Sequence, residues 1–376
     1  MATIGAASGR RRKRRDVTGE TQRFAKMAHS SATRARVART MDTPSADLRL
    51  KALADWLRGA LDSDAFTLSR ASEDASFRRY FRVELDGRTC IAMDAPPPME
   101  NCRPFVHVAQ LLRDAGVHAP EVHAQDLDRG FLLLEDLGTT TYLARLDATN
   151  ANAMYLDAID ALIRFQRASR EGVLPPYDEA LLRRELDFFP DWYVARHVGR
   201  TLDHKQRASL EGVFERVLAN NLGQPRVFVH RDFHSRNLMV CEVNPGVLDF
   251  QDAVYGPVTY DLVSLLRDAY VAWEEERQLD WAVRYWERAR EAGIDVDPDF
   301  GNFWRDFEWM GVQRQIKVLG IFARLCHRDG KSAYVNDMPL VMKYLRGACG
   351  RYRELAPMIV LLDALEGRQP QVGFTF

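Results

Sequence analysis

The sequence predicts an α+β protein of two lobes, with a small strand-rich lobe at the N-terminal side and a larger helical lobe after it. Residues 77–134 hold short runs rich in β-branched and aromatic side chains, separated by turns that contain Asp-Gly or Arg-Gly. After Gly138, apolar residues recur at helical spacing almost to the C-terminus. A single strand pair, between residues 226 and 249, interrupts these helices.

The expected boundaries follow from these changes in pattern. Residues 41–138 should form the N-terminal lobe and residues 139–376 the C-terminal lobe, joined by a connector near residues 135–138. The elements expected in the smaller lobe are a helix at 48–61, a hairpin of strands 77–85 and 89–93 that turns at Asp86-Gly87, a helix at 105–112, and strands at 121–125 and 131–134.

Length and charge narrow the class of protein. The 376 residues are 46% hydrophobic and 10% aromatic, which is enough for packed cores. The formal net charge is −1, but residues 1–40 carry eleven Arg or Lys against two acids, which leaves the rest of the chain at −10. Because nucleic-acid binding depends on cationic contacts to phosphates, we expect a small-ligand protein that binds no nucleic acid. The sequence does not fix the oligomeric state, and we expect a monomer.

Residues 1–40 are rich in Arg, Ala, Ser, Thr and Gly and show no apolar periodicity, which predicts a disordered basic tail. One interpretation makes its basic run at residues 10–15 an anchor for an anionic surface or a nucleic acid. The other, which we favour, makes the tail a dispensable extension, or places the true start of the protein at Met41.

The five cysteines are scattered and show neither a C-x-x-C pair nor a Cys/His spacing typical of zinc sites. This predicts reduced thiols in a cytoplasmic protein. No apolar run approaches the roughly 18 residues that cross a bilayer, and the basic N-terminus lacks the apolar segment of a signal peptide. We therefore expect no membrane partner.

The most informative stretch runs from Val229 to Val240 and contains the pattern H-R-D-x-x-x-x-N, followed by Leu-Asp-Phe at residues 248–250. Short apolar runs flank a turn near Asn244-Pro245-Gly246 and predict a hairpin. Asn237 enters this hairpin and Asp249 leaves it at the same end, so an amide oxygen and a carboxylate should face one another. Hard cations such as Mg²⁺ prefer these oxygen ligands.

Asp232 lies five residues before Asn237 and should face the same cavity. Phosphoryl transfer to a hydroxyl needs a carboxylate that orients the nucleophile and takes its proton, and a metal ion that neutralises the phosphates. Asp232 is therefore the candidate base, and Asn237 and Asp249 are the candidate Mg²⁺ ligands. The alternative is that Asp232 and Asn237 only cap a turn.

Neighbouring polar residues have plainer expected roles. His230 should brace the loop by hydrogen bonding, and His234 has no assigned role. Asp252 has two open interpretations, a further acid near the metal or a local turn former. Asp261 begins a helix after Gly256-Pro257, where a carboxylate caps exposed amides, and is expected to support the loop.

These motifs resemble the aminoglycoside phosphotransferase and choline-kinase-like family over about residues 45–360. The resemblance implies a protein-kinase-like bilobal fold, ATP and Mg²⁺ as cofactors, and a small hydroxylated acceptor. The chain is most similar to the anomeric kinases that act on N-acetylmuramate and N-acetylglucosamine in cell-wall recycling, which implies an amino-sugar acceptor phosphorylated at C1. The segments that carry the resemblance are 76–83, 93–97, 130–138, 230–257, 313–325 and 328–331.

One departure from the kinase pattern concerns the phosphates. Kinases place a lysine on the third strand, but residues 90–94 contain none. A guanidinium is suited to phosphate, and of Arg78, Arg79 and Arg82 on the preceding strand we favour Arg78. Ser76, in the turn before that strand, offers a backbone N–H and a hydroxyl to phosphate oxygens.

The resemblance also implies roles for residues that contact adenine and the acceptor. Glu135, in Leu134-Glu135-Asp136-Leu137, resembles the hinge that presents main-chain groups to adenine. A polar stripe of Gln313, Lys317, Gly320 and Arg324 at helical spacing is a candidate wall of the acceptor site. The alternative is an ordinary solvated helix face.

Two rival functions remain open at this point. One is a kinase for another hydroxylated molecule, such as an aminoglycoside, choline or homoserine. Such cationic acceptors would need an acidic site, whereas Lys317 and Arg324 favour an acidic sugar. The other is a catalytically inactive nucleotide-binding protein, which the missing lysine favours and the presence of Asp232, Asn237 and Asp249 opposes.

The composition of the tail gives a first testable prediction. Deleting residues 1–40 should leave both the melting temperature and the phosphotransferase activity nearly unchanged, because an aperiodic, charge-dense segment buries little apolar surface. Thermal unfolding and a coupled ADP-release assay on the shortened and full chains test this. A large loss in either measurement would show that the tail packs on the body.

Overall fold

The computed structural model of the chain describes residues 44–73, 77–97 and 99–368. The predicted tail and Ser76 therefore lie outside the described residues. The chain divides into two units, residues 1–54 and residues 55–376. The described part of the first unit is the beginning of helix α1 (Pro44–Leu61), and the second unit carries all the other elements.

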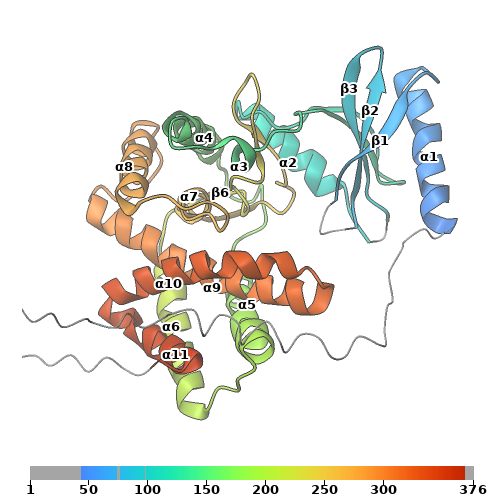
Figure 1. Cartoon of the computed structure of the whole chain (residues 1–376). Helices are drawn as coiled ribbons and strands as arrows, with labels where there is room; N and C mark the ends of the chain where they lie inside the picture. The colour runs from blue at the N-terminus through green and yellow to red at the C-terminus, as the bar shows by residue number, and fades with distance from the viewer. Residues whose placement is uncertain (1–43, 74–76, 98, 369–376) are drawn as a thin grey trace, which may run out of the picture. The chain divides into compact units, whose positions relative to one another are not determined.

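An antiparallel sheet of five strands follows α1, in the order β1-β2-β3-β5-β4. The β2–β3 turn is the predicted one, since Asp86 and Gly87 have φ angles of 50° and 72°, as a two-residue hairpin turn requires. Figure 1 shows β1, β2 and β3 side by side in blue tones. The strand bounds are β1 Thr67–Glu73, β2 Arg79–Leu85, β3 Arg88–Asp94, β4 Val122–Asp126 and β5 Phe131–Glu135.

Helix α2 (Arg103–Asp114) connects β3 to β4 and buries one apolar face that includes Phe105, Val108 and Leu112. The Phe105 ring lies 4.7 Å, centroid to centroid, from the ring of Phe250 in the Leu-Asp-Phe motif. Because Phe250 directly follows Asp249, this contact helps to fix the position of a predicted metal ligand.

The rest of the chain is largely helical, as predicted, and the sheet followed by helices agrees with the expected α+β class. Its helices are α3 Tyr142–Arg145, α4 Ala151–Arg167, α5 Glu179–Phe188, the π-helix η1 Phe189–Val198, α6 His204–Leu222, α7 Tyr260–Leu266, α8 Glu275–Glu291, α9 Phe300–Asp329, the 3₁₀-helix η2 Ser332–Asp337, α10 Met338–Arg351, η3 Arg353–Leu355 and α11 Ala356–Glu366.

Two short strand pairs lie among these helices. Strand β6 (Arg226–Val229) pairs with β9 (Val254–Pro257), and β7 (Leu238–Met239) pairs with β8 (Gly246–Val247), both antiparallel. The second pair is the predicted hairpin. The prediction of a single pair was wrong, because β6 pairs with β9, a strand beyond the hairpin that no adjacent turn connects to it.

The middle of helix α9 is deeply buried. Its residues are buried in an unbroken run from Phe307 to Gly320. A helix buried all round belongs to the interior of a domain rather than to its surface. The buried set includes Gln313, Arg314 and Lys317, so these polar side chains must find partners inside the protein.

Gly320 permits the close approach of two helices. A Cβ at this position would lie 2.5 Å from the backbone carbon of Phe188 and 2.7 Å from its carbonyl oxygen. Gly320 was predicted to lie in a wall of the acceptor site, but it instead lets α9 pack closely against the backbone at the end of α5.

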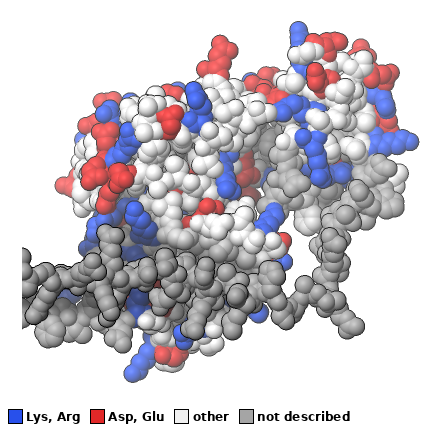
Figure 2. All heavy atoms as spheres, viewed as in Figure 1, with Lys and Arg blue, Asp and Glu red and all other residues white. Residues whose placement is uncertain are grey.

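The charged surface is mixed in sign. On the face drawn in Figure 2, acidic and basic side chains are interspersed and do not separate into one acidic and one basic half. Within residues 44–73, 77–97 and 99–368, the longer helices all carry too many polar residues for a membrane span.

The contact at Gly320 gives a stability prediction. Gly320→Ala should lower the free energy of unfolding by about 1–3 kcal/mol, since the new methyl group meets backbone atoms that cannot rotate away. Gly347→Ala is a matched control, because Gly347 is also inside a helix but a Cβ there would have no neighbour within 4 Å. That change should raise stability by roughly 0.5–1 kcal/mol through helix propensity. Urea unfolding of both variants decides, and a Gly320→Ala protein as stable as the wild type would contradict the packing argument.

Candidate active site

Paired strands fix both ends of the two segments that carry the motif. Residues 230–237 connect β6 to β7, and residues 248–253 connect β8 to β9. The Leu248 amide donates to the Asn237 carbonyl at 2.9 Å and continues the hairpin. As a result, Asn237 Nδ2 lies 3.3 Å from Asp249 Oδ2, so the structure brings these two predicted metal ligands together.

The donor set at this point fits Mg²⁺ bound together with a nucleotide. Mg²⁺ takes one or two protein carboxylates or amide oxygens and completes its shell with phosphate oxygens and water. In the part of the chain that the structure describes, no group of three or more His, Cys, Asp or Glu side chains is arranged to hold a metal ion. Asn237 and Asp249 would hold such an ion, which would supply positive charge to neutralise the phosphate oxygens.

Two residues of these segments have left-handed backbones. Arg231 has φ 78° and Asp249 has φ 62°, conformations that are unfavourable for residues other than glycine. Such strain persists where surrounding contacts hold it, and it concentrates at functional sites. The contacts that hold Arg231 are therefore central to the geometry of the loop.

Asp261 holds the beginning of the loop. Its carboxylate accepts hydrogen bonds from the backbone amides of His230, at 2.6 Å, and Arg231, at 3.0 Å. It lies in the first turn of α7 and is fully buried, but its partners are the loop amides rather than amides of its own helix. Burial raises the pKa of Asp261 to about 7, although the two amides oppose that rise.

His230 links the two segments. Its Nδ1 accepts a hydrogen bond from the Asp232 amide at 3.2 Å, so its Nε2 donates to the Leu248 carbonyl at 3.0 Å. Burial lowers the pKa of His230 to about 4, which keeps the ring neutral near pH 7. A neutral ring with both nitrogens bonded is a brace for the loop.

A buried ionic cluster lies beneath the loop. The Glu185 carboxylate of α5 lies 2.5 Å from a guanidinium nitrogen of Arg231 and 3.1 Å from Nζ of Lys317 on α9. Tyr177 donates its hydroxyl hydrogen to Glu185, and Lys317 donates to the Tyr260 hydroxyl at 2.8 Å. Burial opposes ionisation of Glu185, but Lys317 and Arg231 outweigh it and hold its pKa below the usual range.

Asp232 is ionised because of its cationic neighbours. Burial alone would raise the pKa of this carboxyl, but the charges of Lys317, His234, Arg314 and Arg231 outweigh that effect and lower it to about 2. Asp232 is therefore a carboxylate at every physiological pH. A carboxylate accepts only, so it can orient a hydroxyl by accepting its hydrogen.

The far end of the loop is held by Asp268, which follows α7. Its carboxylate accepts from the Ser235 amide at 2.9 Å and from the Ser235 hydroxyl. Its other oxygen accepts from the Tyr270 amide at 3.0 Å. Asp261 and Asp268 thus anchor the loop on both sides of Asp232.

The three arginines near β2 have different surroundings. Arg79 pairs with Asp94, and Arg82 forms two bonds to Asp136, at 2.6 and 3.0 Å. The Arg78 guanidinium instead lies 3.8 Å from Asp249 Oδ1 and is 10% exposed. Arg78 is therefore the arginine of the three that reaches the predicted metal site.

Glu135 ends β5, and its polar groups already have partners in the sheet. Its amide donates to the Glu121 carbonyl at 2.9 Å, and its carboxylate bonds to His118 Nε2 at 2.9 Å. His118 Nδ1 lies 2.8 Å from the carbonyl oxygen of Val243, which precedes β8. Glu135 thus connects the end of the sheet to the β7–β8 hairpin.

The predicted acceptor stripe has mixed placements. Gln313 is fully buried and donates to the Leu182 carbonyl at 2.9 Å, and Lys317 belongs to the buried cluster. Arg324 is partly exposed, with its guanidinium 5.3 Å from the ring centroid of Phe188. Around Gln313 and Lys317, α9 forms neither an open wall nor a solvated face.

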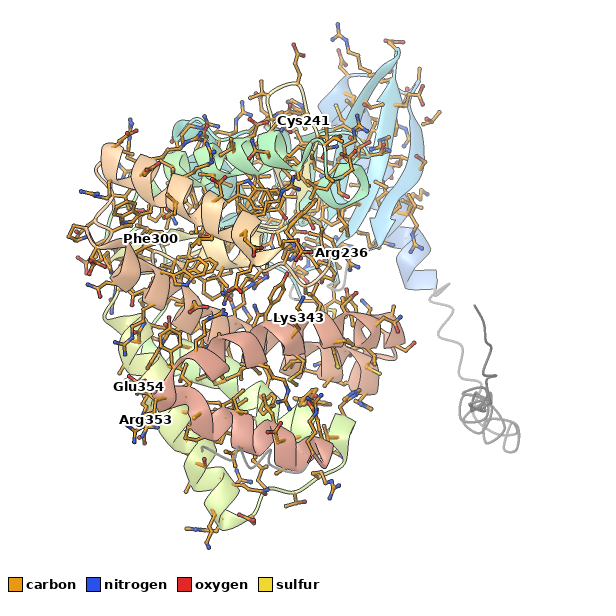
Figure 3. All side chains as sticks on the ribbon, turned by 60° about the vertical axis from the view of Figure 1, so that its left-hand side comes forward. Arg236, Cys241, Phe300, Lys343, Arg353 and Glu354 are labelled. Atoms are coloured by element: carbon orange, nitrogen blue, oxygen red, sulfur yellow. The ribbon has the colours of Figure 1, made fainter. Side chains whose placement is uncertain are left out.

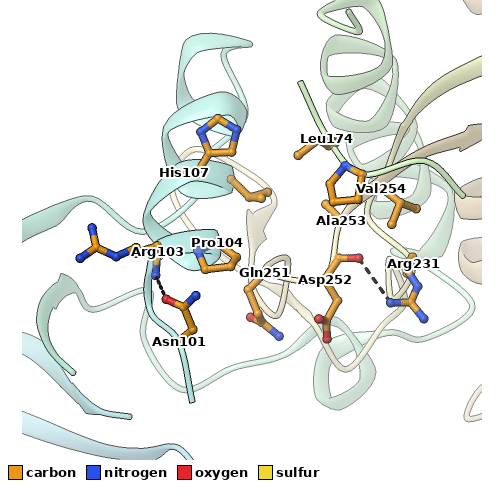
Figure 4. Close-up of a pocket in the computed structure, with 12 residues that line it drawn as sticks. Asn101, Arg103, Pro104, His107, Leu174, Arg231, Gln251, Asp252, Ala253 and Val254 are labelled. Carbon is orange, nitrogen blue, oxygen red and sulfur yellow. Dashed lines mark hydrogen bonds between the residues drawn. The ribbon is translucent and has the colours of Figure 1, made fainter. Parts of the chain in front are cut away.

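A pocket of about 530 Å³ borders the catalytic segment (Figure 4). Its lining includes Arg231 and Gln251, and Gln251 donates to Asp249 Oδ1 at 2.9 Å. Asp252 also lines it, and its carbonyl oxygen lies 3.4 Å from the Arg231 guanidinium. Asp232, Asn237 and Asp249 themselves do not line this pocket, so it is a neighbour of the site rather than its centre.

The predicted site residues omit Glu185 and Asp268, which bond to the loop, and Arg236, which lies within it. Glu185 had a signal in the sequence, since it lies on the helix face of Leu182 and Leu186, where an acid needs a buried partner. Arg236 is part of the motif itself. For Asp268 the sequence offers no comparable signal.

The chain has a sheet followed by helices, and two neighbouring loops carry an ionised Asp, an Asn and a second Asp. These features define a phosphotransferase of the kinase type. Comparisons agree with this class. A family model described as "Phosphotransferase enzyme family" matches residues 67–297. The chain belongs to this family, as its motifs predicted.

Curated relatives match most of the chain. It is 50% identical over 333 residues to the N-acetylmuramate/N-acetylglucosamine kinase of Pseudomonas putida, covering 86% of this chain and 98% of that one. The protein of the same name from Neisseria meningitidis is 49% identical over 330 residues, with the same coverage.

The fold also matches solved structures. A choline kinase from Streptococcus pneumoniae superposes with a TM-score of 0.57 at 13% identity, covering 79% of this chain and 99% of that one. A thermostable mutant of an aminoglycoside phosphotransferase gives a TM-score of 0.51 at 16% identity, covering 79% and 99%. These likenesses confirm the predicted protein-kinase-like fold class.

The charge state of Asp232 gives a kinetic prediction. Asp232→Asn should keep ATP affinity but lower kcat by roughly 100-fold or more, because the amide cannot accept the proton. With a pKa of about 2, wild-type Asp232 should contribute no acidic limb to kcat between pH 5 and 8. Steady-state kinetics at saturating substrates measure both effects. Near-normal turnover of a folded Asp232→Asn variant would rule out this role.

Asp249→Ala is the contrasting variant. It should weaken binding of magnesium and ATP together, since it removes the carboxylate beside Asn237. Calorimetric titration with Mg²⁺ and ATP reports this directly. Unchanged nucleotide affinity would show that Asp249 does not hold the metal.

Proposed function

We propose that this protein is an ATP-dependent sugar kinase that transfers a phosphoryl group to the C1 hydroxyl of N-acetylmuramate and N-acetylglucosamine. The observation that carries the proposal is the position of Asn237, whose side-chain amide lies 3.3 Å from the Asp249 carboxylate and donates to the Asp232 carbonyl at 2.9 Å. The chain that carries this arrangement is 50% identical to a kinase named for these sugars. The phosphoryl donor is ATP, with Mg²⁺ held by Asn237 and Asp249.

The proposed reaction is a single phosphoryl transfer. The C1 hydroxyl oxygen forms a bond to the γ-phosphorus, and the bond from phosphorus to the bridging oxygen breaks as ADP leaves. The proton of the hydroxyl passes to the Asp232 carboxylate and then to solvent. Asp261, His230 and Asp268 keep the loop in place, so that Asp232 is oriented before the acceptor arrives.

The pKa of Asp232 favours the anomeric position. A carboxylate with a pKa of about 2 is a weak base, and efficient proton transfer needs a donor and an acceptor of similar pKa. The anomeric hydroxyl of a sugar is more acidic than its other hydroxyls. C1 is therefore the position that a weak base can best activate.

The absence of the third-strand lysine does not require an inactive protein. We assign its role on the phosphates to Arg78, whose guanidinium lies 3.8 Å from Asp249 Oδ1. Ser76, outside the described residues, is proposed to add donors to the same phosphates. The adenine is proposed to contact the main chain that follows β5. Since the Glu135 amide already donates to Glu121, the contact from Glu135 would come from its carbonyl oxygen.

The surroundings of Asp232 argue against a cationic acceptor. Lys317, Arg314 and Arg231 all act on Asp232, and aminoglycosides or choline would meet this positive charge. A neutral or anionic sugar avoids that repulsion. Phosphorylation of these two sugars at C1 would serve cell-wall recycling in the cytoplasm, where ATP is available.

The test is the position of phosphate in the product. The enzyme with Mg²⁺, ATP and either sugar should give a 1-phosphate, which loses phosphate in mild hot acid because its ring oxygen assists departure through an oxocarbenium-like state. The product should also show coupling between phosphorus and H1 by NMR. An acid-stable product coupled to the H6 protons would reject C1 but keep the kinase. ADP release only with aminoglycosides or choline would reject the sugar acceptor.

A further inference from the structure

The acceptor side of the site can be located from the phosphate side. Asn237, Asp249 and Arg78 gather where the nucleotide phosphates would lie. In-line displacement places the attacking oxygen opposite the departing ADP, next to the base. The acceptor therefore lies next to Asp232. Two residues further along the loop, the ring of His234 lies 5.5 Å, centroid to centroid, from the ring of Tyr270, which follows α7.

Arg236 is the exposed cation on that part of the loop. It directly precedes Asn237, and Figure 3 labels it above the C-terminal helices drawn in red. Its guanidinium carbon lies 3.6 Å from the ring centroid of Tyr270 and 5.8 Å from that of Tyr334 in η2. Two aromatic rings thus hold the guanidinium while the side chain stays exposed to solvent.

The other cations of the site have partners within the protein. Arg231 and Lys317 bind Glu185, and Arg314 reaches the Arg231 carbonyl. Within the described ranges, no carboxylate lies within 4.0 Å of the Arg236 guanidinium. Stacking uses the flat face of a guanidinium and leaves its five N–H donors directed outward in the plane.

The acids near Arg236 do not replace an external partner. Asp268 is bonded to Ser235 and to the Tyr270 amide. Asp337 interacts with Arg236 only at longer range, and burial raises the pKa of its carboxyl.

The two proposed acceptors differ in one group that a guanidinium recognises. N-acetylmuramate carries a lactyl ether on its third oxygen that ends in a carboxylate, and N-acetylglucosamine has a plain hydroxyl there. Planar guanidinium groups bind carboxylates through two parallel hydrogen bonds. We infer that Arg236, stacked on Tyr270, binds the lactyl carboxylate and so determines the preference between the two sugars. This inference rests on the proposed function.

The experiment compares both acceptors in the wild type and in two variants of Arg236. In Arg236→Gln, the ratio of kcat/KM for N-acetylmuramate to that for N-acetylglucosamine should fall by about 10- to 100-fold, the effect of a lost charge-assisted hydrogen bond. Arg236→Lys keeps the charge but loses the two-bond geometry, so its ratio should lie between those of Arg236→Gln and the wild type. Melting temperatures identify any variant that fails to fold.

Arg290→Gln is the matched control. Arg290 is also exposed, and its guanidinium lies 4.7 Å from the ring centroid of Trp286, but it belongs to α8, away from the loop. Its acceptor ratio should equal that of the wild type. A change as large as that of Arg236→Gln would mean that general surface charge, not a contact, sets the ratio.

A modified acceptor isolates the contact. The primary amide of the lactyl group removes the negative charge from N-acetylmuramate and keeps its size. The wild type should discriminate against this amide, and Arg236→Gln should not, so the two changes should be strongly non-additive.

The outcomes separate the inference from the proposed function. Additive effects of the amide and the substitution, or an equal fall in kcat/KM for both sugars, would overturn the assignment to Arg236 while leaving the sugar kinase intact. A wild-type enzyme inactive on both sugars would instead reject the proposed function. An unchanged ratio in a folded Arg236→Gln variant would also overturn the inference.

Discussion

The catalytic loop depends on the buried ionic cluster of Glu185, Arg231 and Lys317. Arg231 has a left-handed backbone that most residues avoid, and Glu185 holds its side chain while Asp261 holds its amide. Breaking one partner of such a cluster leaves a buried charge uncompensated, which is far more costly than losing an exposed ion pair. The cluster therefore ties the direction of the loop to the packing of α5 against α9.

The same cluster determines the chemistry of Asp232. Lys317 and Arg231 are neutralised only in part by Glu185, and their remaining field, with that of Arg314, keeps Asp232 ionised despite its burial. As the proposed base, such a carboxylate is suited to orienting an acidic hydroxyl rather than to removing a strongly held proton. Support of the loop and the charge state of Asp232 thus come from one set of side chains.

On the phosphate side of the proposed site, the surroundings of three arginines bear on which of them could replace the missing lysine. Kinases have a lysine on the third strand, but residues 90–94 contain none. Asp94 of this strand is paired with Arg79. Arg82 pairs with Asp136 at the end of the sheet. Arg78, which directly precedes β2, is the arginine of the three that extends to Asp249, so it is the one placed to act on the phosphates in the proposed site.

The sequence by itself determined the fold class, the family and the hairpin that places Asn237 beside Asp249, because these follow from local periodicity, turn residues and a motif of fixed spacing. It did not determine the partners of side chains far apart in the chain. Gln313, Lys317 and Gly320 matched a polar helix stripe, yet residues 307–320 of α9 are buried all round, so Lys317 binds Glu185 and Gly320 meets Phe188. Which arginine reaches Asp249, and which acids hold the loop, depends on how α5, α7 and α9 pack, and no local pattern encodes that packing.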